Sequence, residues 1–171
     1  MSLKSFQKAV LLGLFVLLSS TPLFADQSSL DATLAQIAEI AKVGRVAEIG
    51  AIQGDVWFRK DGTTEWKGAE KGLFLLEKDA IKTGENGKAE ILLDSKGETG
   101  KLDLAANTEM SIETMKKDPD SDDKTTLLDL ALGKVLIKVE KLKGNSSFQV
   151  KTPTSICGVR GTLFEVTVEA K

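Results

Sequence analysis

Histidine is absent from the 171-residue sequence, and cysteine occurs only once, as Cys157. Without histidine the chain has no Ser-His-Asp triad, no Cys–His dyad and no histidine-ligated zinc or iron site. A single cysteine also excludes a metal site built from a cysteine cluster. The enzymatic chemistry that remains is that of paired carboxylates, of Ser–Lys sites or of a metal held by oxygen atoms alone.

The lone cysteine cannot form a disulfide within the chain, although export permits disulfides. Cys157 stands between Ile156 and Gly158 in an apolar C-terminal segment. This setting favours a small buried side chain. The alternative is an intermolecular disulfide or a reactive thiol.

Long apolar runs are scarce, and the one at the N-terminus is short. Lys4 and Lys8 precede an apolar run over 9–18, and Pro22 and Ala25 follow it. This order is typical of a secretory signal peptide, residues 1–25, cleaved near Ala25. The run is shorter than the about 20 apolar residues of a membrane-spanning helix. We therefore expect a periplasmic or secreted protein with no transmembrane helix in the mature chain; the alternative is an uncleaved N-terminal anchor.

The charge balance is slightly acidic, with 23 Lys and Arg against 25 Asp and Glu. Cleavage after Ala25 removes Lys4, Lys8 and no acid, which leaves 146 residues with a net charge of −4. This length suffices for one domain with its own core. Because nucleic-acid binding depends on basic surfaces, we expect no nucleic-acid partner.

Residues 26–44 have a helical pattern, in which Leu30, Leu34, Ile37 and Ile40 fall on one face. We predict a short helical leader there. Its apolar face would be exposed if it did not pack, which makes self-association or docking an expectation.

From residue 45 to residue 171 the apolar pattern changes to a period of two. Short alternating runs such as Phe164–Val168 are separated by turn residues such as Lys60-Asp61-Gly62. Gly133 separates two predicted strands, 126–132 and 134–140. We predict one all-β domain over 45–171: a two-layer, mainly antiparallel β-sandwich or roll of short strands. Its large core residues are expected to be Trp57, Phe58, Trp66, Phe74, Phe148 and Phe164.

Two sequence blocks follow one another across this region. The first block contains Trp66-Lys-Gly-Ala69, Gly72-Leu73, Leu75, Asp79-Ala-Ile-Lys-Thr-Gly84, Asn86-Gly87, Ala89 and Ile91-Leu-Leu-Asp94. The second contains Gly133-Lys-Val135, Phe148, Val150, Thr152-Pro153, Val159-Arg-Gly-Thr162, Phe164 and Val166. In order and spacing the two blocks resemble the FecR domain family, named for the ferric-citrate regulator of cell-surface signalling.

The resemblance implies an extracytoplasmic β-domain for binding or assembly at the cell envelope. The signalling members also have a cytoplasmic segment that binds a sigma factor, a transmembrane helix and a further module that contacts an outer-membrane receptor. Here a signal peptide replaces the first two, and the sequence ends at Lys171. The sigma-factor function is therefore not expected for this chain.

Most residues of these blocks have structural interpretations. We predict that Asp79 caps a turn through its side chain and that Thr83-Gly84 and Asn86-Gly87 form tight turns. Arg160 is expected to donate to carbonyls or to pair with a carboxylate. In the alternative, Arg160 and Thr162 face a partner or an anionic ligand.

An acidic segment spaces Asp118, Asp120 and Asp122 at alternate positions, and Asp129 lies eleven residues after Asp118. This spacing is similar to that of a calcium loop with ligands at positions 1, 3, 5 and 12. It departs from the motif at Asp123, where the loop has Gly, and at Asp129, where it has Glu. The competing interpretation is a solvated acidic hairpin loop.

The leading functional hypothesis is a non-enzymatic extracytoplasmic FecR-type domain that binds a protein or an envelope polysaccharide, for sensing, signalling or envelope assembly. The alternative is a calcium-dependent structural or adhesive surface domain that uses the acidic segment. A hydrolase with paired carboxylates, Asp55 with Glu65 or Asp79 with Asp94, is a third hypothesis. No cofactor is expected apart from calcium.

Overall fold

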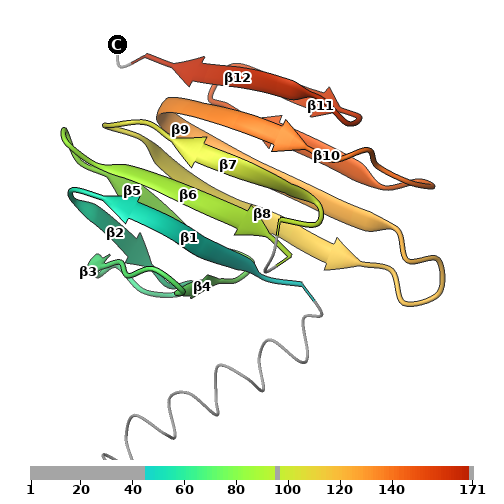
Figure 1. Cartoon of the computed structure of the whole chain (residues 1–171), viewed down its shortest axis with the longest axis horizontal. Coiled ribbons are helices and arrows are strands. Elements are labelled where there is room, and N and C mark those ends of the chain that lie inside the picture. Colours follow the sequence, from blue (N-terminus) through green and yellow to red (C-terminus); the bar gives the residue numbers. More distant parts are fainter. Residues whose placement is uncertain (1–44, 95–96, 170–171) are drawn as a thin grey trace, which may run out of the picture. The chain divides into compact units, whose positions relative to one another are not determined.

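The computed structural model describes residues 45–94 and 97–169, which all belong to one compact unit of the chain. These residues form strands and turns but no helix, so none among them could span a membrane as a helix (Figure 1). The predicted signal peptide and helical leader lie outside the described residues. The strands are β1 (Ala47–Gln53), β2 (Val56–Arg59), β3 (Lys67–Gly68), β4 (Phe74–Leu75), β5 (Ala80–Thr83), β6 (Lys88–Leu93), β7 (Gly100–Leu104), β8 (Glu109–Lys117), β9 (Lys124–Val139), β10 (Ser147–Lys151), β11 (Ile156–Val159) and β12 (Leu163–Val168).

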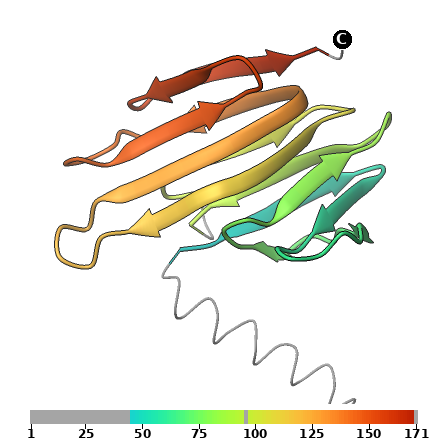
Figure 2. The same ribbon diagram turned by 180° about the vertical axis from the view of Figure 1, so that it is seen from behind.

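The strands form one sheet that curls around a single core, in the order β3-β2-β5-β8-β9-β7-β6-β1-β4, with β10, β11 and β12 attached beside β9 (Figures 1 and 2). One edge of β9 pairs first with β8 and then with β7. Its other edge pairs with β10 in parallel over 125–129 and with β12 in antiparallel over 133–138. The prediction of an all-β, mainly antiparallel domain is confirmed. One curled sheet takes the place of two separate layers.

Gly133 is the point where β9 passes from one half of the sheet to the other. It has a φ of +94°, and a Cβ atom there would lie 2.5 Å from the Thr108 Cα atom. Only glycine fits such a conformation at such a close approach. The two strands predicted over 126–132 and 134–140 are therefore one strand of 16 residues, in which Gly133 makes a bend and not a turn.

The core consists of the inward-facing residues of both halves of the sheet, because side chains alternate along each strand. In β9, for example, Leu128, Leu130, Val135 and Ile137 are fully buried. Of the six aromatic residues predicted for the core, only Phe148 is fully buried. Phe58 and Phe164 are partly buried and pack against the core.

Trp57 and Trp66 lie outside the core, which corrects the prediction. The Lys82 Nζ atom lies 5.4 Å from the centroid of the Trp57 ring and 4.4 Å from that of Trp66, and the Arg59 guanidinium lies 5.1 Å from Trp66. Val56 of β2 is buried and Phe58 packs against the core, so the alternate residues Trp57 and Arg59 face outward. There the indoles stack with cations, contacts worth about 0.5–1 kcal/mol each at exposed sites.

The predicted turns are confirmed where the structure describes them. The buried Asp79 carboxylate accepts hydrogen bonds from the backbone N–H groups of Leu76, at 2.9 Å, and Asp61, at 3.0 Å, and from Lys60 Nζ at 2.6 Å. Asp79 therefore caps its own turn and ties it to the β2–β3 turn. The Gly87 N–H donates to the Gly84 carbonyl at 3.0 Å, which closes the tight turn between β5 and β6.

Candidate binding surface at the open end of the sheet

The curled sheet has two pairs of edge strands, and the pairs differ in length. At one end β3 and β4 have two residues each. At the other end β11 has four residues and pairs only with β10, while β12 has six and pairs only with β9. We call the surface made of β11, β12 and the 160–162 turn between them the open end (Figure 2). It presents longer unpaired backbone edges than β3 and β4 do, and such edges are templates for pairing with another strand.

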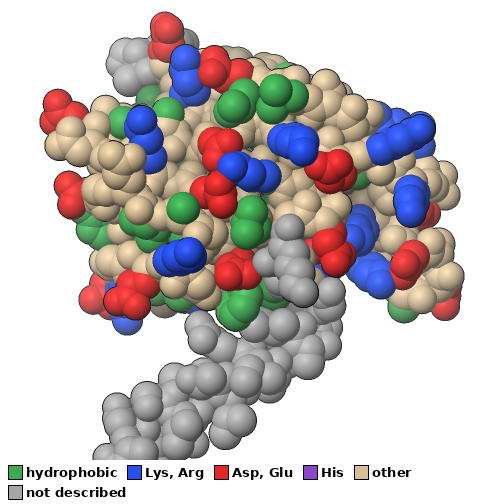
Figure 3. Space-filling model, in the orientation of Figure 1, with side chains coloured by type: hydrophobic (Ala, Val, Ile, Leu, Met, Phe, Trp, Pro, Cys, Tyr) green, Lys and Arg blue, Asp and Glu red, His purple; other side chains and the backbone are tan. Residues whose placement is uncertain are grey.

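A pocket of about 790 Å³ lies at the open end, lined by residues 164–169 along β12, by Cys157 of β11, by residues 152–155 and by Ala131 and Leu132 of β9. Phe164, Val166 and Val168 of β12 are half-buried, pack against the core and line this pocket. In the described part of the chain, the large hydrophobic side chains that are exposed are Leu136 (37%), Ile156 (63%) and Leu163 (63%). All three lie on β11, on β12 or on the part of β9 that pairs with β12. Figure 3 shows apolar side chains at the surface over β12.

Arg160 and Thr162, the two predicted binding residues, lie together in the turn at the open end, and both are exposed. The Arg160 Nη2 group donates to the Gly144 carbonyl at 2.6 Å, so the predicted hydrogen bond to a carbonyl is confirmed. Gly161 has a φ of +73°, and a Cβ atom there would lie 2.9 Å from the Lys141 Cα atom. The turn is thus pressed against the chain at 141–144, and Arg160 is exposed there.

Cys157 is exposed, so the prediction that it is buried is wrong. It lies on the edge strand β11, which among the described residues pairs with β10 alone. The sequence analysis predicts no strand at 156–159, where the structure has β11. Whether such a strand is covered depends on elements far away in the sequence.

The acidic segment forms the turn between β8 and β9. The Asp118 carboxylate accepts from the N–H groups of Asp120 and Ser121, both at 2.9 Å, and Asp122 pairs with Lys117 at 2.7 Å. Asp129 lies six residues beyond Asp123, about 20 Å along an extended strand, and it pairs with Lys151 at 2.8 Å. The residues that the structure describes contain no group of three or more carboxylates or thiols suited to a metal ion. The calcium site stays a prediction that this arrangement does not favour.

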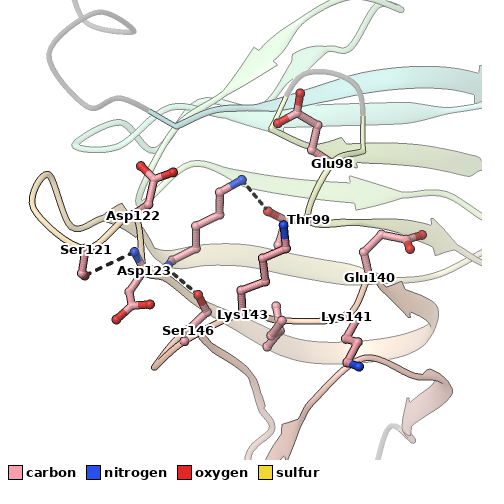
Figure 4. A pocket seen from close by; sticks show the side chains of 12 residues that line it. Glu98, Thr99, Ser121, Asp122, Asp123, Glu140, Lys141, Lys143 and Ser146 are labelled. Carbon is pink, nitrogen blue, oxygen red and sulfur yellow. Dashed lines mark hydrogen bonds between the residues drawn. The ribbon is translucent and has the colours of Figure 1, made fainter.

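A second pocket, of about 410 Å³, lies between this turn and the loop at 140–146 (Figure 4). The Asp123 carboxylate accepts from the Asn145 N–H at 3.0 Å, and the Lys124 N–H donates to Ser146 Oγ at 3.0 Å, so the two loops are bound together. Acidic side chains (Glu98, Asp122, Asp123, Glu140) and lysines (Lys124, Lys141, Lys143) alternate around the pocket. This mixture of charges selects neither an anion nor a cation.

A buried ion pair beside this pocket was missed by the sequence reasoning. Arg45 donates from Nε to Asp94 at 2.7 Å and from Nη1 to the carbonyls of Lys116 and Thr125 at 3.0 Å each. The Arg45 side chain is 1% exposed and that of Asp94 is 10% exposed. Lys124 Nζ, at 2.9 Å, and the Thr99 hydroxyl also donate to Asp94.

These contacts decide the ionisation of Asp94. Burial alone would raise the pKa of the Asp94 carboxyl, but the hydrogen bonds from Arg45, Thr99 and Lys124 outweigh it and hold the pKa below its usual value. The pair joins the segment just before β1 to the paired ends of β8 and β9. All of these contacts are made within the fold, so we assign Arg45 and Asp94 a structural role.

Three of the four carboxylates of the hydrolase hypothesis lie beside cations in the structure. Asp79 is engaged by Lys60 at 2.6 Å, whereas Asp94 is engaged by Arg45 and Lys124. Glu65 is exposed and lies 3.6 Å from Lys67. A general acid–base pair needs two carboxylates that face one substrate.

Comparison with known proteins adds one finding to this geometry. The family model described as FecR protein matches residues 79–171, which include the open end and the second sequence block. The chain belongs to the FecR family, and this membership suggests a signalling or regulatory role. Neither the curated proteins nor the solved structures yield a significant match to the chain.

Proposed function

We propose that this protein is a non-enzymatic, extracytoplasmic FecR-type domain that binds a protein partner at the open end of its sheet. The observation that carries the proposal is the concentration of features there. The longer unpaired edges, the apolar pocket and the exposed large hydrophobic side chains of the described residues coincide with the Arg160–Thr162 turn. Exposed edges and apolar pockets are the elements with which β-domains take up extended segments of partners.

The proposed location and the absence of catalysis rest on other observations. The basic and apolar pattern of residues 1–25 and the family both favour export. The lack of histidine, together with the engagement of Asp79 and Asp94 by cations, supports binding over catalysis.

Affinity capture of residues 26–171 from the envelope fraction, read by mass spectrometry, tests this function. Wild type and Arg59→Ala, in which an arginine away from the open end is replaced, are expected to recover the same protein. Arg160→Ala is expected to recover about tenfold less, because exposed arginines are frequent anchors of binding surfaces. No specific protein, or equal recovery by Arg160→Ala, would contradict the proposal.

The same capture separates the other partner classes. Recovery of an envelope polysaccharide that is lost in Arg59→Ala would move the binding surface to the stack of Trp57, Trp66 and Lys82. Recovery that requires calcium would favour the acidic-segment alternative. Either outcome would overturn the assignment to the open end.

A further inference from the structure

The free edge of β12 has hydrogen-bonding groups at defined residues. The Val139 N–H donates to the Thr162 carbonyl at 2.9 Å, and β12 continues antiparallel to β9 from Leu163 opposite Lys138. Because bonded residues alternate in an antiparallel pair, Phe164, Val166 and Val168 bond to β9. The N–H and C=O groups of Leu163, Glu165 and Thr167 therefore point away from the sheet.

We propose that a second copy of this chain occupies this edge, with the two β12 strands antiparallel about a twofold axis at Val166. The inference rests on the proposed function of the open end as a binding surface and names one partner for it. A twofold contact must be complementary to itself, so that each residue meets a suitable residue of the other copy.

The charges of β12 select the register. Two registers bring the outward-pointing N–H and C=O groups of the two β12 strands together over most of their length. One is centred on Glu165 and the other on Val166. The first sets Glu165 against Glu165 of the partner subunit, and like charges directly opposite each other are destabilising. The second sets Glu165 against Thr167 of the partner subunit and leaves the ion pair of Glu165 with Lys134, at 3.2 Å, in place.

The apolar inner face of β12 fits the same register. Phe164 would stand opposite Val168 of the partner subunit, and Val166 opposite Val166 of the partner subunit. All three positions are only partly buried within one chain and line the apolar pocket. Pairing would therefore cover apolar surface that is open to water in the single chain. It would also cover the free edge of β12.

The test is a disulfide at the twofold axis, in residues 26–171 with Cys157→Ser as background. Val166 would form a non-hydrogen-bonded pair with its copy, where Cα atoms lie about 4.5 Å apart, within the range of a disulfide. Val166→Cys is expected to convert most of the monomer band to a dimer band under mild oxidation, reversed by reductant. Phe164→Cys is the matched control, because its copy would lie about 13 Å away along the partner strand.

Sedimentation of the reduced, unsubstituted chain is expected to show about twice the monomer mass. Equal cross-linking of Val166→Cys and Phe164→Cys, or a folded Val166→Cys variant that stays monomeric and uncross-linked, would overturn the proposal. If that monomer still captures a protein in an Arg160-dependent way, self-pairing fails and the proposed function stands. If cross-linking succeeds but capture recovers nothing except this chain, the open end serves self-association alone.

Discussion

Replacing Arg45 by methionine is expected to lower the free energy of unfolding by about 3–5 kcal/mol, the range for breaking a buried ion pair. Methionine keeps much of the apolar stem but leaves the Asp94 carboxylate without its main partner and removes the hydrogen bonds from Arg45 to the Lys116 and Thr125 carbonyls. Urea denaturation at neutral pH measures the loss. Lys101→Met is the control, because its ion pair with Glu90 is partly exposed and such pairs contribute about 1 kcal/mol or less.

The pH dependence separates the ion pair from a packing effect. The pKa of Asp94 is lowered in the folded protein from 3.8, so the stability that ionised Asp94 contributes is fully present above pH 3.8. It is lost as the pH falls through the lower folded pKa. The difference between wild type and Arg45→Met should therefore shrink in acid below 3.8. A difference that stays constant there would show that the loss comes from packing and not from charge.

Gly133→Ala is expected to destabilise the domain by about 2–5 kcal/mol, because the added Cβ is both strained and blocked. The positive φ costs an alanine about 1–2 kcal/mol, and the Cβ atom would stand 2.5 Å from Thr108 Cα and from the Asn107 carbonyl oxygen. Thermal or urea unfolding measures the change.

Gly62→Ala makes the same substitution at a φ of +70° with no atom within 4 Å of the added Cβ. It therefore carries the conformational cost alone, about 1–2 kcal/mol. Equal losses for the two variants would contradict the account of Gly133, because the close approach to the β7–β8 connection would then contribute nothing.

Features that depend on local pattern were predictable from the sequence. The alternation of side chains predicts the all-β class, and an aspartate beside turn residues predicts the cap that Asp79 makes. One of its donors, the Leu76 N–H, is only three residues away. Gly133 was recognised as a break in the pattern. Its consequence, a bend within one strand, depends on Thr108 of another segment.

Features that depend on distant segments were not predictable in the same way. Arg45 and Asp94 are 49 residues apart, and a lone arginine ahead of a strand carries no local sign of a buried partner. The position of Asp94 directly after an alternating strand was the one available signal. The sequence analysis assigns Cys157, Trp57 and Trp66 to the interior because apolar residues favour it, but Cys157 is exposed on an edge strand and the two indoles stack with cations. The acidic segment matched a calcium spacing, yet the strand β9 carries Asp129 away from the other carboxylates.

Residue-resolved amide hydrogen exchange of β12 tests the central claim, that the open end binds through the free edge of this strand. In dilute protein, Phe164 and Val166 should be protected by β9, whereas Glu165 and Thr167 should exchange rapidly. At high protein concentration, or with the captured partner, exchange at Glu165 and Thr167 should slow by about tenfold or more. Lys67 and Gly68 of the edge strand β3 should not change. A complex that forms while Glu165 and Thr167 keep exchanging rapidly, or that protects β3 instead, would contradict the account.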